Sequence, residues 1–233
     1  MGDLGARAKS VQSYADKYEK DRPVLPVFEL IAVVVQGAPG GDGKWRRRVP
    51  ESVVDDYLKA ARDARALLLL NIQPGHSDML TEAKHFEKYL KEPDVGLALD
   101  PEWEVKGKDR PGKVYGQTTG AEINDVAKYV AGLVAGGDLP EKLVVFHQVN
   151  LHVVKDEASI VAHPGVVLVK GVDGLGPKGA KITTYNLLTK ALPSHVHAGF
   201  KLFFEEDTAN GWQLMKPEEV LGLKPVPEYV MYE

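Results

Sequence analysis

The stretch LALDPEW holds two acids whose spacing suits proton transfer. Asp100 and Glu102 lie two residues apart at the end of an apolar run, so an extended chain directs both side chains to the same face. When two carboxyl groups share a buried site, the pKa of one of them rises, which places an acid beside a base. The pattern predicts acid–base catalysis, with Glu102 as general acid and Asp100 tuning its pKa.

Glu205 is the predicted second catalytic carboxylate. In FKLFFEED it shares an alternate face with Lys201. If Lys201 points inward, Glu205 would lie opposite Glu102 and act as base or nucleophile, as paired carboxylates do in glycosidases. Glu29, within an earlier apolar run, is expected instead to form a buried ion pair with Lys201 or Lys170.

Polar side chains end most of the other apolar runs. Amides, a histidine ring and charged groups at such positions can orient the hydroxyl or carbonyl groups of a ligand, and an aromatic ring can pack against it. The expected ligand-binding residues are Asn71, Gln73, Trp103, His147, Gln148, Lys170, Asp173 and Lys201.

Known cofactor and metal motifs are missing from the sequence. It contains no HExxH, P-loop, GxSxG or EF-hand pattern. We therefore expect no cofactor and no bound metal. One alternative stays open, because Glu102, His147 and Glu205 from three strand ends could together chelate a divalent ion.

Seven short apolar runs rich in Val, Leu and Ile recur along the chain. They cover 27–36, 66–73, 95–102, 142–149, 166–173, 199–205 and 229–232. Segments with helical spacing of apolar residues separate them, and this alternation is typical of parallel strands joined by crossover helices.

Helices are expected near 4–18, 54–61, 79–90, 119–136, 181–192 and 217–221. Thr119 and Glu122 have the spacing of a capping box, and Pro217 suits the first position of a helix. Every predicted strand except the last is thus followed by a helix or a long loop.

The alternation along VGLALDPE favours a closed barrel over an open doubly wound sheet. One face carries Gly96, Ala98, Asp100 and Glu102, and the other carries Val95, Leu97 and Leu99. Small and acidic residues suit a narrow interior, whereas large apolar residues suit contact with helices. We predict a single α/β domain, 1–233, with a (β/α)8-type TIM barrel fold. Seven strands are one short, so the barrel is either incomplete or completed by an unassigned segment or a partner chain.

Composition excludes several classes of function. The 233 residues include 29 Lys and Arg against 33 Asp and Glu, a net charge of -4, which argues against nucleic acid as a partner. The absence of cysteine removes thiol catalysis and disulfides. Since neither a signal peptide nor a membrane span is visible, we expect a cytoplasmic protein whose partner is a small-molecule or carbohydrate substrate. Homo-oligomer formation stays open.

Five strand-end motifs resemble those of a family of bacterial proteins. They read LNIQPG (70–75), LALDPEW (97–103), VFHQV (145–149), KGVDGLG (170–176) and FKLFFEED (200–207). They resemble the strand ends of an uncharacterised TIM-barrel family with a glycoside-hydrolase-like layout, such as LDIQPG, LALDPEW and FKLFYEED. The resemblance covers most of the chain. The resemblance implies a barrel with its site at the strand ends. Asn71 replaces an expected aspartate and Lys170 an expected asparagine, which argues against hydrolytic roles at those positions.

The leading hypothesis is glycoside-hydrolase-like hydrolysis of a sugar-containing substrate. A cofactor-independent isomerase, lyase or cyclase acting on a small biosynthetic intermediate is the first alternative, and a non-catalytic ligand-binding barrel is the second. Cavity shape separates the first two, because an open cleft with exposed tryptophan suits a glycan and a closed pocket suits a small intermediate.

Overall fold

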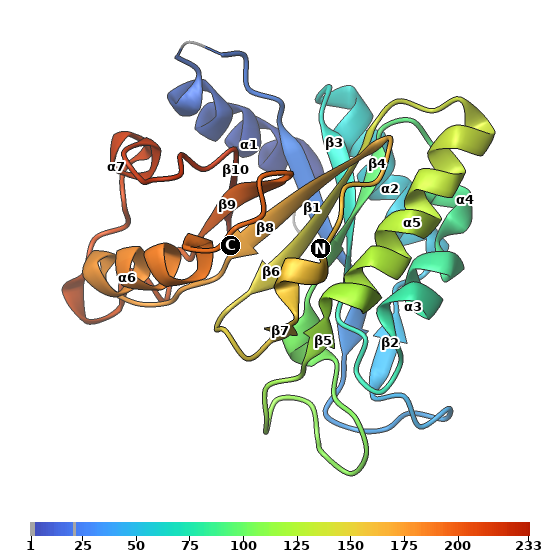
Figure 1. Cartoon of the computed structure of the whole chain (residues 1–233). Helices are drawn as coiled ribbons and strands as arrows, with labels where there is room; N and C mark the ends of the chain where they lie inside the picture. The colour runs from blue at the N-terminus through green and yellow to red at the C-terminus, as the bar shows by residue number, and fades with distance from the viewer. Residues whose placement is uncertain (1–2, 21) are drawn as a thin grey trace.

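The computed structural model describes residues 3–20 and 22–233 and contains one eight-stranded sheet in a mixed α/β arrangement (Figure 1). Its strands are β1 (Val27–Val35), β2 (Arg46–Arg48), β3 (Leu67–Ile72), β4 (Val95–Leu99), β6 (Lys142–Gln148), β8 (Val166–Val172), β9 (Val196–Leu202) and β10 (Tyr229–Tyr232). The order is β10-β9-β8-β6-β4-β3-β1-β2, and all neighbours pair in parallel except β1 and β2. All seven predicted runs are therefore confirmed as strands of one sheet.

Helices follow the predicted segments closely. They are α1 (Leu4–Tyr18), α2 (Glu51–Asp63), α3 (Met79–His85), α4 (Glu87–Leu90), α5 (Gly120–Gly137), α6 (Lys178–Thr189) and α7 (Pro217–Leu221). The capping box at α5 is confirmed, because the Glu122 N–H donates to Thr119 Oγ1 at 3.2 Å and Glu122 Oε2 accepts from the Thr119 N–H at 2.9 Å. Strands β5 (Thr118–Thr119) and β7 (Val154–Lys155) form a separate two-stranded ladder.

The two faces of the sheet differ in the size of their side chains. On the convex face, large apolar residues such as Leu97 and Phe146 pack against the helices. The concave face buries a smaller cluster that includes Leu69, Ala98, Val145, Val169 and Tyr229. A Cβ on Gly96 would collide with the Leu143 backbone of the neighbouring strand. The predicted division of β4 into a small inner and a large outer face is confirmed.

The sheet curls into a half-barrel. Across the described strands, hydrogen-bonded pairing runs from β10 to β2 and does not join β10 to β1. The α/β class is confirmed, but closure into a complete (β/α)8 barrel is not evident. Helix α1 connects the two ends of the row of parallel strands. At one end it contacts α2, which packs on β1. At the other end it contacts α7, and the hydroxyl groups of Tyr18 in α1 and Tyr232 in β10 are hydrogen-bonded at 2.7 Å.

Strand β2 was not predicted, because its sequence is an arginine run. Arg46 and Arg48 donate to the carboxylate of Glu82 on α3 at 2.9 and 2.7 Å, and Glu82 is completely buried. The buried acid therefore holds this loop as an antiparallel edge strand of the sheet.

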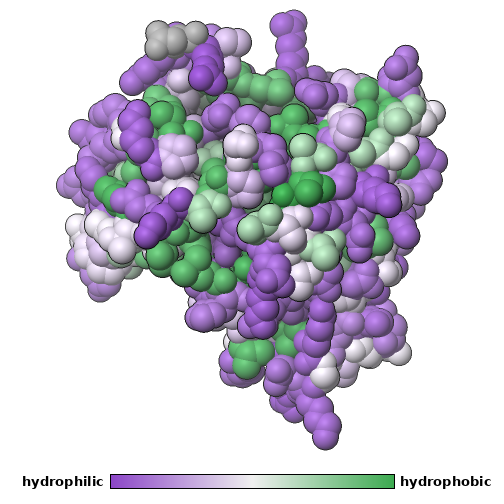
Figure 2. Space-filling model, viewed as in Figure 1, coloured by the Kyte–Doolittle hydropathy of each residue, from purple (hydrophilic) through white to green (hydrophobic). Residues whose placement is uncertain are grey.

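Among the residues that the structure describes, no helix combines the length and the apolar character needed to cross a bilayer. On the face drawn in Figure 2, hydrophobic residues form scattered patches among hydrophilic ones.

Candidate functional site

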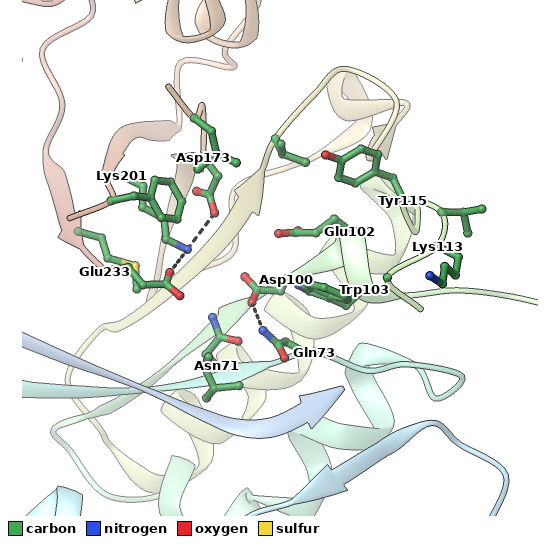
Figure 3. Close-up of a pocket in the computed structure, with 17 residues that line it drawn as sticks. Asn71, Gln73, Asp100, Glu102, Trp103, Lys113, Tyr115, Asp173, Lys201 and Glu233 are labelled. Atoms are coloured by element: carbon green, nitrogen blue, oxygen red, sulfur yellow. Dashed lines mark hydrogen bonds and ion pairs between the residues drawn. The ribbon is translucent and has the colours of Figure 1, made fainter. Parts of the chain in front are cut away.

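A cavity of about 500 Å³ opens at the carboxyl ends of the parallel strands (Figure 3). Its lining comprises Ile31, Asn71, Gln73, Asp100, Glu102, Trp103, Gly112, Lys113, Val114, Tyr115, Val149, Asp173, Leu175, Lys201, Phe203, Met231 and Glu233. Loops and side chains after parallel strands meet at this end of the sheet, which is where barrel and open α/β proteins place their ligands. Five of the residues expected to bind ligand, Asn71, Gln73, Trp103, Asp173 and Lys201, belong to this lining.

Asp100 and Glu102 both face the cavity. Asp100 directly follows β4, is 4% exposed, and accepts a hydrogen bond from Gln73 Nε2 at 3.2 Å through Oδ2. Glu102 lies in the 3-10 helix η1 (Pro101–Trp103) and is half-buried. Within the described part of the chain, Asp100 Oδ1 and Glu102 Oε2 are buried with no hydrogen-bond partner.

The protonation of this acid pair follows from its surroundings. Burial raises the pKa of Asp100. Burial, with added repulsion from Asp100 and Asp173, raises the pKa of Glu102 well above its ordinary value. Because a buried carboxyl without a compensating charge favours its neutral form, Glu102 is the group best suited to hold a proton.

His147 lies below the cavity at the end of β6 and is fully buried between two carboxylates. Its Nδ1 lies 2.9 Å from Asp173 Oδ1, and its Nε2 lies 3.1 Å from Glu29 Oε1. Burial lowers the pKa of His147, but Asp173 and Glu29 more than offset this and hold it well above its ordinary value. The two carboxylates and the raised pKa both favour an imidazolium that donates a hydrogen bond from each ring nitrogen. A Cβ on Gly171 of the next strand would lie 2.8 Å from its Nδ1, so glycine leaves the ring its space.

Glu29 is held by three donors from different strands. Besides His147, Asn71 Nδ2 donates to its Oε1 at 2.6 Å and the Tyr229 hydroxyl donates to its Oε2 at 2.7 Å. Burial raises the pKa of Glu29, but the charge and hydrogen bond of His147 and the other donors bring it below its ordinary value. The expected ion pair of Glu29 with Lys201 or Lys170 is therefore wrong.

Lys201 instead joins two other carboxylates. Its Nζ lies 3.1 Å from Asp173 Oδ2 and 2.6 Å from Glu233 Oε2. Burial lowers the pKa of Lys201, but Asp173 and further carboxylates reverse the effect and raise it. The inward position expected for Lys201 is confirmed. The sequence analysis missed Glu233 and Tyr229, although the alternation of Tyr229, Met231 and Glu233 along and just after the weak apolar run 229–232 was the available signal.

Glu205 does not lie opposite Glu102. Strand β9 ends at Leu202 and the chain turns, with the Phe203 N–H donating to Asp207 Oδ2 at 2.9 Å. Because the period of two ends with the strand, Glu205 is exposed and is not among the residues that line the cavity. Its expected position is wrong, and the structure does not bring Glu205 to Glu102 and His147, as the metal alternative left open by the sequence would require.

Lys170 and Gln148 also lie outside the cavity lining. Lys170 points to the outer face of β8, where Nζ contacts Glu157 at 2.8 Å and the Leu188 carbonyl at 2.6 Å. Gln148 follows His147 and so points to the opposite face, where its Nε2 donates to the Asn150 carbonyl at 3.0 Å. Both residues were expected to bind ligand, and this prediction is wrong, because each side chain points to the face of the sheet opposite the cavity.

A different set of residues has metal-binding geometry. Asp100, His147 and Asp173 each offer one ligand atom, and the three atoms lie within 4.8 Å of one another. Both ring nitrogens of His147 already face carboxylates, however. A metal ion would have to displace a proton from the imidazolium, because only a neutral histidine nitrogen ligates metals.

A loop after η1 covers one side of the cavity. The Gly116 N–H donates to the Glu102 carbonyl at 2.6 Å, and a Cβ on Gly116 would clash with the Glu104 backbone. This close approach positions Val114 and Tyr115, which are 44% and 62% exposed, at the cavity mouth. The loop adds apolar surface to a cavity whose inner end is charged (Figure 3).

Comparisons with known proteins add no functional assignment to this geometry: the chain matches no protein-family model and no curated protein sequence.

Proposed function

We propose that this protein is an acid–base enzyme that hydrolyses a small sugar-containing substrate, with Glu102 as the general acid. The observation that carries the proposal is the pair of buried oxygens, Asp100 Oδ1 and Glu102 Oε2, which have no partner in the described residues and belong to side chains that line one cavity. Glycoside hydrolysis needs a carboxyl group that still holds its proton near neutral pH.

Asp173 takes the role that the sequence analysis gave to Glu205. Burial raises the pKa of Asp173, but His147 and Lys201 lower it overall, so the carboxylate stays ionised beside the cavity. Glu102 would protonate the leaving oxygen, and Asp173 would act as base or nucleophile. Asn71 and Gln73 would orient hydroxyl groups, and Trp103 would pack against the sugar ring.

We also propose that the curled sheet is related to the (β/α)8-type TIM barrel of the family that its strand-end motifs resemble, with one parallel strand fewer. Seven parallel strands in sequential order and a cavity at their carboxyl ends support this layout. Helix α1 would cover the position between β10 and β1 where the eighth strand would lie.

Isomerisation, elimination or cyclisation of a small intermediate is the second candidate function. A cavity of about 500 Å³ matches a small molecule better than a long polysaccharide. The same acid and base would serve, without water as a reactant.

Matched glutamate substitutions test the proposed function. A panel of methyl glycosides, whose alkoxide leaving group needs a proton from the acid, provides the substrates, with released reducing sugar as the readout, and Glu205→Gln, an exposed acid outside the cavity, provides the control. We expect Glu102→Gln to lower kcat roughly 10²–10⁴-fold with little change in ligand binding, because the proton donor is lost. Turnover that survives Glu102→Gln, or that falls equally in Glu205→Gln, contradicts the assignment. Ligand binding without turnover in the wild type indicates a binding protein.

A further inference from the structure

The cavity has more hydrogen-bond acceptors and negative charges than it has donors and positive charges. Its lining contains the carboxyl groups of Asp100, Glu102, Asp173 and Glu233. Lys201 already contacts Asp173 and Glu233. The other lysine of the lining, Lys113, lies on the exposed loop.

Three side-chain oxygen atoms of the cavity lining have no protein partner among the described residues. Asn71 Oδ1, Asp100 Oδ1 and Glu102 Oε2 are buried, and none has a hydrogen-bond partner in residues 3–20 and 22–233. Asn71 is 2% exposed, and one N–H of its amide donates to Glu29, which fixes the orientation of the amide and leaves Oδ1 as its acceptor without a partner. A buried acceptor without a partner costs about 1–3 kcal/mol, which a ligand with donors would recover.

We propose that the ligand of this cavity carries a protonated amine, which binds between Asn71 and Asp100, so that the substrates are small hydroxylated amines such as amino sugars. The inference rests on the proposed function only for the sugar-like part of the ligand. The amine position follows from the acceptors themselves.

An ammonium group matches these surroundings in number of donors and in charge. It offers three N–H donors and no acceptor, so it can satisfy Asn71 Oδ1 and Asp100 Oδ1 together. Its charge compensates a buried carboxylate, which a neutral hydroxyl group cannot do. Trp103 and Phe203 also line the cavity, and aromatic faces attract cations. A carboxylate ligand would instead face four carboxyl groups.

Binding of a protonated amine is compatible with a protonated Glu102. The titratable groups that act on Asp100 are His147, Lys201, Asp173 and Glu29, together with Glu102 two residues away, and both cations among them already pair with carboxylates. A bound ammonium therefore favours ionisation of Asp100, the group it contacts, while Glu102 keeps its proton for the leaving oxygen.

Three ring-matched probes test the amine site without turnover. Benzylamine, benzyl alcohol and benzoate share one ring and differ in charge, and their binding to the full chain can be followed by NMR titration at pH 7. We expect benzylamine to bind about tenfold more tightly than benzyl alcohol, because a charge-assisted hydrogen bond replaces a neutral one, and benzoate to bind more weakly than both. Equal affinity for benzylamine and benzyl alcohol, or no binding of benzylamine, overturns the proposal.

Asp100→Asn and Glu205→Gln locate the effect. Each variant removes one carboxylate. Asp100→Asn should abolish the preference for benzylamine, because Asp100 lines the cavity, whereas Glu205→Gln should keep it, because Glu205 lies outside the cavity. A preference that survives Asp100→Asn also overturns the proposal, and the wild-type series decides the question if this variant does not fold. Glycoside hydrolysis without amine preference would refute this inference alone, and amine preference without hydrolysis would refute the proposed function alone.

Discussion

At the scale of single residues, His147 determines the charge balance beneath the cavity. Asp173 and Glu29 approach its two ring nitrogens at 2.9 and 3.1 Å, so the imidazolium compensates two buried carboxylates at once. Asp173 then bridges His147 to Lys201. A neutral His147 would donate only one of these hydrogen bonds and would leave an anion uncompensated, which is costly in a buried site.

His147 is accordingly expected to stay doubly protonated well above pH 6.5. The stability that its charge contributes is fully present below pH 6.5, its ordinary pKa, and is lost only as pH rises through the raised pKa of the folded protein. Long-range ¹H–¹⁵N correlation spectra should show two protonated ring nitrogens for His147 at pH 7. A neutral tautomer at that pH would contradict the assignment and would free a nitrogen for the metal geometry formed with Asp100 and Asp173.

At the scale of elements, the loop after η1 joins the cavity to helix α5. Glu104 is 3% exposed in this loop, and burial together with the nearby Glu122 raises its pKa to about 7, although Lys106 opposes the shift. Glu122 is also the residue that caps α5. The protonation of one buried acid is therefore linked to the loop that carries Tyr115 over the cavity.

Glu104 should make the protein less stable as pH rises. The folded state binds its proton more tightly than the unfolded state, so its contribution is present below about pH 4.5 and is lost as pH rises to about 7. In the wild type, this effect should lower the free energy of unfolding by roughly 2–3 kcal/mol between pH 4.5 and pH 7, and Glu104→Gln should abolish this decrease. Urea denaturation at a series of pH values measures it. The Glu205→Gln profile should match that of the wild type. A Glu104→Gln profile that also matches it would contradict the raised pKa.

At the scale of the whole molecule, a hydrogen bond crosses the interior where the sheet does not pair. Glu29 of β1 and Tyr229 of β10 lie on the first and last of the parallel strands, and their side chains meet at 2.7 Å. On the outside, Tyr18 of α1 meets Tyr232 of β10. The two ends of the curl are thus tied together by side chains, both inside and outside.

Two tyrosine substitutions compare these ties. Tyr229→Phe should lower the free energy of unfolding by about 1–3 kcal/mol, because it removes a donor from the buried Glu29 carboxylate. Tyr18→Phe, which loses a bond between two part-buried hydroxyls, should cost about 1 kcal/mol or less. Chemical denaturation measures both values. An equal or smaller loss for Tyr229→Phe would show that the interior bond does not hold the curl.

The sequence by itself determined the seven parallel strands, most of the helices and the acid pair. The apolar runs became strands, the capping box at Thr119 started α5, and Asp100 came to face the cavity with Glu102. The strands and α5 depend on residues a few positions apart, and the periods of the strand and the helix act over that same range. Glu102 reaches the cavity from η1, just beyond the end of β4.

Only the tertiary structure decided which distant groups meet. Glu205 is exposed because β9 ends three residues before it. The curl of the sheet brought Glu233 to Lys201 and Tyr229 to Glu29. Strand β2 formed because Glu82, far along the chain, binds its arginines. Such contacts depend on strand ends, register and curvature, and these are set by packing over the whole sheet, so local periodicity carries no information about them.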